Sequence, residues 1–230
     1  MRPVQFTKRI ALLWLIGTAA LLPPSIFAAE AARDATEVRI TEDIPSVTIQ
    51  HRGHTVTIKR IEDTENRLVD DFTKTSRPCP PFCIHPMEAA PGVRTIGEVE
   101  LLDFLREEVS VEKGTLIDAR MPEWYHAEAI PGSVNIPFVV LSSPSAQRDE
   151  ILKLLGGRPL GADKYDFTAA TRLALYCNGP WCDQSTRAIK GLIAAGYPPE
   201  KLLYYRGGMQ LWKLMGLTTV LPKSQVVRHH

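Results

Sequence analysis

Short apolar runs alternate with amphipathic stretches through most of the chain beyond residue 93. The runs Thr115–Ile117, Leu173–Tyr176 and Leu202–Tyr205 are short, continuous and apolar, which is typical of buried strands. Amphipathic segments follow two of them, at Thr186–Ala195 and Met209–Met215, and their spacing predicts helices. Because strands that alternate with helices form parallel sheets, the pattern predicts an α/β domain with a mainly parallel sheet and helices on both faces.

The first helix of this domain is predicted from a capping pattern. Thr95 stands where an N-cap residue is expected, and Glu98 follows three residues later, which is the spacing of a capping box. Apolar residues then recur at helical spacing as far as Leu105. We therefore expect a helix that starts at Thr95 and ends near Glu108.

Further elements are expected between the first two buried runs. The Pro and Gly of Ile130–Ser133 predict a turn, and Val134–Ile136 predicts a short strand after it. The segment Ser142–Leu155 is expected to contain a helix, and the segment Gly156–Thr168 to be a loop.

A β-hairpin is predicted ahead of this domain. Val47–Ile49 and Thr55–Ile58 alternate β-branched and polar residues, and Gly53 lies in the turn between them. Isolated hairpins are only marginally stable, so we expect this one to pack on the main domain. We interpret His51 and His54, which flank the turn, as solvated residues, because no third metal ligand accompanies them.

The N-terminus has the order of features found in secretory signal peptides. A basic segment precedes an apolar stretch over residues 10–22, which is shorter than the roughly 20 residues that a membrane span needs. Small residues follow, and cleavage after Ala28 or after Ala31 fits them. We expect residues 1–31 to be removed, which leaves a periplasmic or secreted protein without a stable membrane span.

Composition narrows the choice of protein class. The chain has 230 residues, of which 44% are hydrophobic and 23% charged, as in globular proteins. Its net charge of +1 and its lack of long charged runs point away from nucleic acid and anionic membranes. We divide the chain after the signal peptide into an extension (32–92), the α/β domain (93–222) and a tail (223–230).

Cys79 and Cys83 lie four residues apart in a proline-stiffened segment of the extension. An exported protein can form disulfides, but four cysteines allow three pairings that sequence does not distinguish. A disulfide between these two needs a turn that brings their Cα atoms within about 7 Å. Buried thiols, a redox role and a metal site with His85 are the alternatives. We predict no metal site, because a fourth ligand is missing.

Cys177 is the leading candidate for a nucleophile. It ends an apolar run, and a Gly- and Pro-containing loop followed by an amphipathic helix comes next. A thiol at the start of a helix lies among backbone N–H groups and at the positive end of the helix dipole, which lowers its pKa and favours the reactive thiolate. A buried structural cysteine is the alternative. The loop residues that would form an anion-binding nest with it are Asn178, Gly179, Pro180, Trp181, Asp183, Gln184 and Ser185.

Individual loop residues have expected roles. Gly179 allows close backbone approach, and Pro180 stiffens the loop. Ser185 is expected either to cap the helix or to donate to the site, and Trp181 either to wall the pocket or simply to pack. Cys182, five residues after Cys177, is a candidate resolving thiol.

Three charged residues complete the candidate site. Asp118 and Arg120 follow a buried strand, at the sheet edge where open α/β folds place their binding crevice. A salt bridge that fixes the loop and direct substrate contact are the two roles open to them. Arg206 precedes the glycine pair that opens the last helix.

In this order and spacing, three segments resemble the rhodanese (thiosulfate sulfurtransferase) family. They are Leu116–Arg120 with Ile130–Pro137, then Tyr176-Cys177, then Tyr205–Trp212. The resemblance implies a rhodanese-like fold, a catalytic Cys177 that carries sulfur as a persulfide, and Asp118 and Arg120 near its loop. Donors would be thiosulfate, a polysulfide or a persulfide, and acceptors a thiol or cyanide. No cofactor is required. The upstream Cys-Pro-Pro-Phe-Cys segment is similar to that of exported bacterial members.

The sequence departs from the family pattern in two places. Many members carry Arg five positions after the cysteine, whereas this chain has Cys182 there and the serine that opens the helix is delayed to Ser185. Arg would bind an anionic donor, so its loss speaks against thiosulfate more than against cysteine chemistry. Arg206 or Arg187 could supply the missing charge. The second departure is Ala129, which replaces a histidine of the family.

Two other functions stay open beside the sulfurtransferase. A Cys177–Cys182 disulfide would make the protein a thiol–disulfide redox protein. A binding module that kept the fold without catalysis is the third reading, and the retained Cys177 argues against it. The sequence identifies no protein partner.

Overall fold

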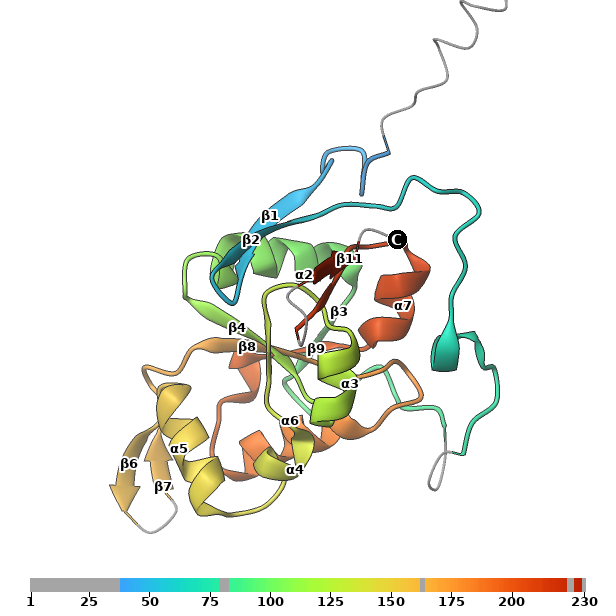
Figure 1. Ribbon diagram of the computed structural model, residues 1–230. Coiled ribbons are helices and arrows are strands. Elements are labelled where there is room, and N and C mark those ends of the chain that lie inside the picture. Colours follow the sequence, from blue (N-terminus) through green and yellow to red (C-terminus); the bar gives the residue numbers. More distant parts are fainter. Residues whose placement is uncertain (1–37, 79–82, 162–163, 223–225, 229–230) are drawn as a thin grey trace, which may run out of the picture. The chain divides into compact units, whose positions relative to one another are not determined.

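The computed structural model describes residues 38–78, 83–161, 164–222 and 226–228. The expected signal peptide and most of the expected C-terminal tail lie outside these residues, as does Cys79. At the centre is a five-stranded sheet in which every pair of neighbours is parallel (Figure 1). In spatial order its strands are β3 (Arg94–Ile96), β9 (Leu202–Tyr205), β8 (Arg172–Tyr176), β4 (Gly114–Asp118) and β5 (Ser133–Asn135).

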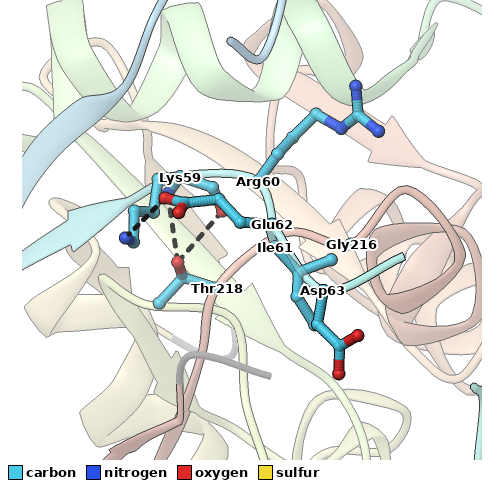
Figure 2. A pocket seen from close by; sticks show the side chains of 7 residues that line it. All are labelled: Lys59, Arg60, Ile61, Glu62, Asp63, Gly216 and Thr218. Atoms are coloured by element: carbon cyan, nitrogen blue, oxygen red, sulfur yellow. Dashed lines mark hydrogen bonds and ion pairs between the residues drawn. The ribbon is translucent and has the colours of Figure 1, made fainter. Parts of the chain in front are cut away.

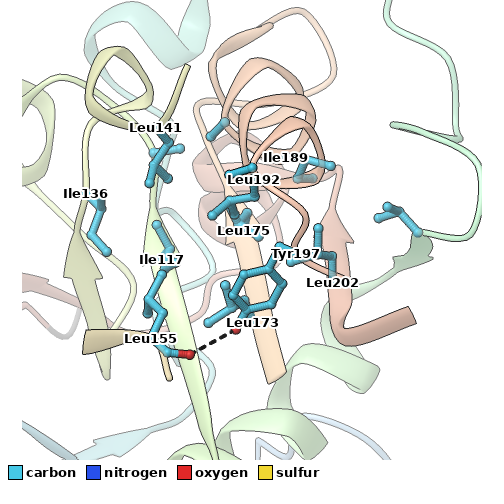
Figure 3. Close-up of a cluster of buried hydrophobic side chains, with 14 of the residues drawn as sticks. Ile117, Ile136, Leu141, Leu155, Leu173, Leu175, Ile189, Leu192, Tyr197 and Leu202 are labelled. Carbon is cyan, nitrogen blue, oxygen red and sulfur yellow. Dashed lines mark hydrogen bonds between the residues drawn. The ribbon is translucent and has the colours of Figure 1, made fainter. Parts of the chain in front are cut away.

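The side chains of successive residues of the central strand β8 pack into two separate hydrophobic cores, one on each face of the sheet. Leu173 and Leu175 face a cluster that includes side chains of α4 (Phe138–Leu141), α5 (Ala146–Leu154) and α6 (Gln184–Ala194) (Figure 3). Side chains in a strand alternate between faces, so the intervening residues face the other side. The predicted parallel sheet with helices on both faces is confirmed.

The second core is formed by α2 (Glu98–Phe104) and α7 (Gly208–Leu214) together with part of the extension. Ala174 and Tyr176 of β8 belong to it, and Trp212 of α7 is fully buried within it.

The predicted hairpin is confirmed, and it packs on the domain as expected. Its strands β1 (Val47–His51) and β2 (His54–Ile58) are antiparallel, with His51 opposite His54. One face of the hairpin is apolar and joins the second core, which also contains Leu105 of the π-helical turn η2 (Leu105–Val109). The extension is therefore part of the folded domain rather than a separate unit.

The interpretation of His51 as a solvated residue is wrong. Its side chain is 7% exposed, and its Nδ1 accepts a hydrogen bond of 3.1 Å from the backbone N–H of Gly132. Burial, with the positive charge of Arg52 and His54 nearby, lowers the pKa of His51 to about 4. The imidazole is neutral in the fold because Nδ1 must keep its lone pair to accept this bond. His54 is exposed, as expected.

The expected capping box at Thr95 is also wrong. Thr95 lies in β3, where it pairs with Tyr204 of β9. The helix begins three residues later, after the N-cap Gly97, whose N–H donates to Glu100 Oε2 at 3.0 Å. Parallel strand pairing, which no local pattern reveals, takes the residues that would have opened the helix. Glu98 accepts a hydrogen bond of 2.9 Å from the Tyr205 hydroxyl instead of capping.

Other boundaries follow the sequence more closely. The helix expected within Ser142–Leu155 is α5, and Ser145 caps it by accepting from the N–H of Arg148 at 3.1 Å. The expected loop at Gly156–Thr168 instead contains a small antiparallel pair, and the remaining elements were not predicted. These are α4, β6 (Arg158–Gly161), β7 (Lys164–Asp166), α3 (Pro122–Ala127), η1 (Asp70–Thr73), η3 (Pro199–Lys201), β10 (Thr219–Leu221) and β11 (Val226–Arg228). They are all too short to show a hydrophobic period.

None of the helices in the described part of the chain is long and apolar enough to span a membrane.

We predict that His51 makes the stability of the protein depend on pH. Its pKa is about 4 in the fold and 6.5 when unperturbed, so the unfolded chain binds more protons between these values. The stabilisation is complete above pH 6.5 and is lost as the pH falls towards 4, by about 3 kcal/mol. Denaturant unfolding at a series of pH values measures this. The free energy of unfolding should depend less on pH in His51→Gln than in the unaltered protein, and as strongly in His54→Gln. Equal dependence on pH in all three proteins would contradict the prediction.

Candidate active site

Cys177 directly follows β8, and the residues after it form a tight loop that leads into α6. The loop closes through a hydrogen bond of 2.9 Å from the N–H of Cys182 to the carbonyl of Gly179. Gly179 permits this path, because a Cβ there would lie 2.9 Å from the Cβ of Gln210. The strand, the turn and the helix thus place the thiol at the carboxyl edge of the sheet, as predicted.

The start of α7 holds this loop from the other side. The N–H of Met209 donates to the carbonyl of Cys177 at 3.0 Å, and the N–H of Gln210 donates to that of Asn178 at 2.8 Å. Gly208 makes the approach possible: its φ is +56°, and a Cβ on it would lie 2.4 Å from the Cys177 carbonyl oxygen. Only glycine fits there without moving the backbone.

The thiol of Cys177 is 2% exposed and is surrounded by hydrogen-bonding groups. The Ser185 hydroxyl lies 3.1 Å from its sulfur, and the carbonyl of Cys182 is 3.2 Å away. Burial raises the pKa of the Cys177 thiol. Hydrogen bonds from the Cys182 thiol, from the Ser185 hydroxyl and from the N–H groups of Ser185 and Gly179 outweigh burial, so the pKa lies below the ordinary value for cysteine. The environment favours a thiolate at this position.

Cys182 is the protonated partner of this pair. Its carbonyl oxygen lies 3.2 Å from the Cys177 sulfur, and the residue is 6% exposed. The hydrogen bond to Cys177 and burial both raise the pKa of the Cys182 thiol. Both cysteines are free thiols. The residue that replaces the family's arginine therefore contacts the nucleophile directly.

Ser185 does not cap the helix, contrary to one of its two expected roles. It is fully buried in the first turn of α6, and its hydroxyl points to the Cys177 sulfur. Asp183 occupies the N-cap position without a side-chain cap, and Gln184 begins the helix. The positive end of the helix thus faces the thiol, and no carboxylate caps it.

Asp118 and Arg120 form a buried salt bridge that reaches the loop. Arg120 Nε donates to Asp118 Oδ1 at 2.9 Å, and Arg120 Nη1 donates to Asn178 Oδ1 at 3.2 Å. Tyr176 closes the network by donating from its hydroxyl to Asp118 Oδ2 at 2.8 Å. Both charged side chains are at most 1% exposed. The network fixes the residue next to Cys177, which is the first of the two expected roles.

The two arginines expected to replace the missing charge are engaged elsewhere. Arg206 donates from Nη2 to the carbonyl of His85 at 2.8 Å. The guanidinium of Arg187 lies 4.3 Å from the ring centre of Phe138 and 4.0 Å from the carboxylate of Asp183. Neither approaches the Cys177 sulfur through any interaction of the described residues.

Residues of the extension that sequence analysis missed contact the loop. The Arg77 guanidinium stacks 3.9 Å from the ring centre of Trp181, and the N–H of His85 donates to the carbonyl of Pro180 at 3.2 Å. Trp181 therefore packs beneath a cation.

Cys83 is disulfide-bonded, and since Cys177 and Cys182 are free, neither is its partner. The expected partner Cys79 lies outside the described residues. In the sequence, only the position of Arg77 beside the proline-rich segment could have pointed to its contact with the cysteine loop.

A separate hollow lies where the extension meets the end of α7 (Figure 2). It has a volume of about 210 Å³. Lys59 forms an ion pair of 3.2 Å with Glu62, and the N–H of Lys59 donates to Thr218 Oγ1 at 3.0 Å. Its lining contains no cysteine or histidine. Among the described residues, no group of three or more His, Cys, Asp or Glu side chains could hold a metal ion.

Comparison with known proteins identifies the fold family. A family model for the rhodanese-like domain matches residues 100–215. The chain belongs to this family. The match includes Cys177, its loop and the Asp118–Arg120 pair, whereas the hairpin, Arg77 and Cys83 lie outside it. A rhodanese-like domain is consistent with sulfurtransferase activity.

Individual relatives of this rhodanese-like protein are distant. An HTH-type transcriptional regulator of Mycobacterium tuberculosis is 32% identical over 103 residues, which cover 45% of this chain and 36% of the regulator. The chain thus spans about a third of that relative. A rhodanese-related protein from Thermoplasma volcanium is 23% identical, with a TM-score of 0.38, over 56% of this chain and 98% of its own. A thiosulfate sulfurtransferase from Pseudomonas aeruginosa is 19% identical, with a TM-score of 0.36, over 62% of this chain and 21% of its own.

We predict that Ser185→Ala raises the pKa of the Cys177 thiol by about 1, because the thiolate loses a hydroxyl donor. The measurement is the ultraviolet absorbance of the thiolate against pH, with the curve of Cys177→Ala subtracted. Thr186→Ala is the matched control, because its hydroxyl donates to the carbonyl of Asp183 and not to sulfur. An unchanged curve in Ser185→Ala would show that this hydroxyl does not stabilise the thiolate.

Proposed function

We propose that this protein is a sulfurtransferase or sulfur carrier that holds sulfane sulfur as a persulfide on Cys177. The observation that carries the proposal is the buried Cys177 sulfur, which accepts hydrogen bonds from the Ser185 hydroxyl and from the backbone N–H groups of Gly179 and Ser185. These donors stabilise a thiolate, and the same donors would stabilise the negative charge of a persulfide.

The proposed reaction has two steps and uses covalent catalysis. The Cys177 thiolate attacks the sulfane sulfur of a donor, forms an S–S bond and displaces the rest of the donor with its electron pair. The terminal sulfur of the persulfide is then attacked by a thiol or by cyanide, and Cys177 leaves as the thiolate. Arg120 acts as a positioning residue, because it holds Asn178 beside the nucleophile.

Polysulfides and persulfides are the donors that fit this loop best. Cys182 stands at the position where many family members carry Arg, and Arg206 and Arg187 are engaged with other partners. A doubly charged donor such as thiosulfate would therefore lack the bidentate cation that favours its binding.

We propose that the protein works in the periplasm or outside the cell. The signal-like segment at residues 1–31 is the basis of this proposal. The disulfide of Cys83 supports it, since disulfides persist mainly in oxidising compartments.

A second candidate function is thiol–disulfide exchange. The place of Cys182 on the same turn favours it, with its carbonyl oxygen 3.2 Å from the Cys177 sulfur, because a resolving thiol must reach the nucleophile. A non-catalytic binding module is less favoured, since such a module has no need of a stabilised thiolate.

The test is a measurement of intact mass. We expect the purified, reduced Cys182→Ser variant to gain the mass of one sulfur atom when treated with polysulfide, and to lose it as thiocyanate when cyanide is added. The Cys177→Ser variant is the control and should gain none. Failure of Cys182→Ser to take up sulfur from polysulfide or from thiosulfate would reject the proposal. If the unaltered protein then forms a Cys177–Cys182 disulfide, thiol–disulfide exchange is the better function.

A further inference from the structure

Two free thiols lie within one turn of the active-site loop. Cys177 and Cys182 are both buried, and the Cys177 sulfur lies 3.2 Å from the carbonyl oxygen of Cys182. The hydrogen bond from the Cys182 N–H to Gly179 holds the second cysteine in place. A sulfur atom carried by Cys177 would therefore arrive beside a thiol that is already positioned.

Access from outside is much more restricted. The Cys177 side chain is only 2% exposed. On the outer part of the loop, Arg77 stacks on Trp181, and the backbone of His85 is bonded to Pro180. An external thiol must reach the persulfide past these contacts, whereas Cys182 needs no approach.

We propose that Cys182 resolves the Cys177 persulfide, so that the protein releases the transferred sulfur as sulfide and is left with a Cys177–Cys182 disulfide. This inference rests on the proposed function, because it requires a persulfide on Cys177. It makes the protein a converter of sulfane sulfur to sulfide rather than a donor of sulfur to a bulky acceptor.

The step balances in atoms and electrons. The Cys182 sulfur attacks the inner, Cys177 sulfur of the persulfide and forms the new S–S bond. The bond between that sulfur and the terminal sulfur breaks, and the terminal sulfur leaves with the electron pair. The proton of the Cys182 thiol goes to the leaving sulfur, which departs as HS⁻. The Cys182 sulfur is oxidised to the disulfide level, the terminal sulfur is reduced to sulfide, and the Cys177 sulfur exchanges one S–S bond for another.

Proximity favours this step over attack by a free thiol. Groups held in contact react as if one were present at a very high effective concentration, with measured values of about 10⁵ M and above for well-oriented pairs. Cys182 attacks as its thiolate, so its proton passes to the terminal sulfur as the new S–S bond forms.

The resulting disulfide must be reduced before another turnover. The reductant is a dithiol, small or protein-bound. It reduces the Cys177–Cys182 disulfide by thiol–disulfide exchange and becomes a disulfide itself. The overall reaction thus consumes a sulfane donor and a dithiol, and yields sulfide and a disulfide. A dithiol-containing reductase is the class of partner that this reaction requires.

A single-turnover experiment without reductant tests the inference. The probe is an alkanethiosulfonate anion, R–SO2–S⁻, which transfers its outer sulfur to the thiolate and leaves as the sulfinate R–SO2⁻, so that it contributes no sulfide. After brief reduction and desalting, the unaltered protein should release about one sulfide per chain and lose the mass of two hydrogen atoms. Cys182→Ser should release none and should keep one added sulfur atom.

The outcomes separate the two proposals. A stable persulfide in the unaltered protein, with no sulfide released, would overturn the resolving role of Cys182 and leave the proposed function intact. A disulfide without stoichiometric sulfide would also overturn it, because oxidation would then bypass the persulfide. If neither protein takes up sulfur from the thiosulfonate, from polysulfide or from thiosulfate, the proposed function itself fails.

Discussion

The salt bridge between Asp118 and Arg120 is the interaction on which the site depends. A buried ion pair is costly unless its geometry is good and its remaining hydrogen-bonding groups are satisfied. Here Arg120 also donates to Asn178 and to the carbonyl of Glu128, and Asp118 also accepts from Tyr176. The ends of β4 and β8 and the start of the cysteine loop are thereby joined in one network. Loss of either Asp118 or Arg120 would leave the other charge buried without its partner and would release the loop.

Hydrogen bonds, more than formal charge, create the reactive thiol in this protein. No arginine or lysine of the described residues bonds to the Cys177 sulfur, and burial alone would keep it protonated. The donors come from two elements, the turn at Gly179 and the first turn of α6 with Ser185, together with the neighbouring thiol of Cys182. Neutral donors stabilise the charge of a thiolate or persulfide, but they do not bind an oxyanion through two charge-assisted hydrogen bonds as arginine does. The loop therefore favours transfer of sulfur over binding of an oxyanion.

Sequence predicted the parts of this molecule that local patterns control. The apolar run Leu173–Tyr176 became β8, and the loop and helix after it brought Cys177 and Ser185 together. The position of Thr95 could not be read in this way, because strand pairing with the distant β9 overrode a local capping pattern. The stacking of Arg77 on Trp181 joins residues more than a hundred positions apart, and their spacing in the sequence does not predict this contact. The burial of His51 likewise depends on Gly132, which the hairpin meets only in the folded domain.

Gly208 has a consequence for how the active site comes into being. Its close approach to the carbonyl of Cys177 means that the loop is complete only when the start of α7 has docked. Synthesis proceeds from the N-terminus, so Cys177 leaves the ribosome before the residues that hold its loop. A nascent chain that ends short of α7 would carry the cysteine pair on an unclamped loop, open to stray oxidation. Maturation of the thiol is thus tied to the docking of α7, which acts as a checkpoint on its chemistry.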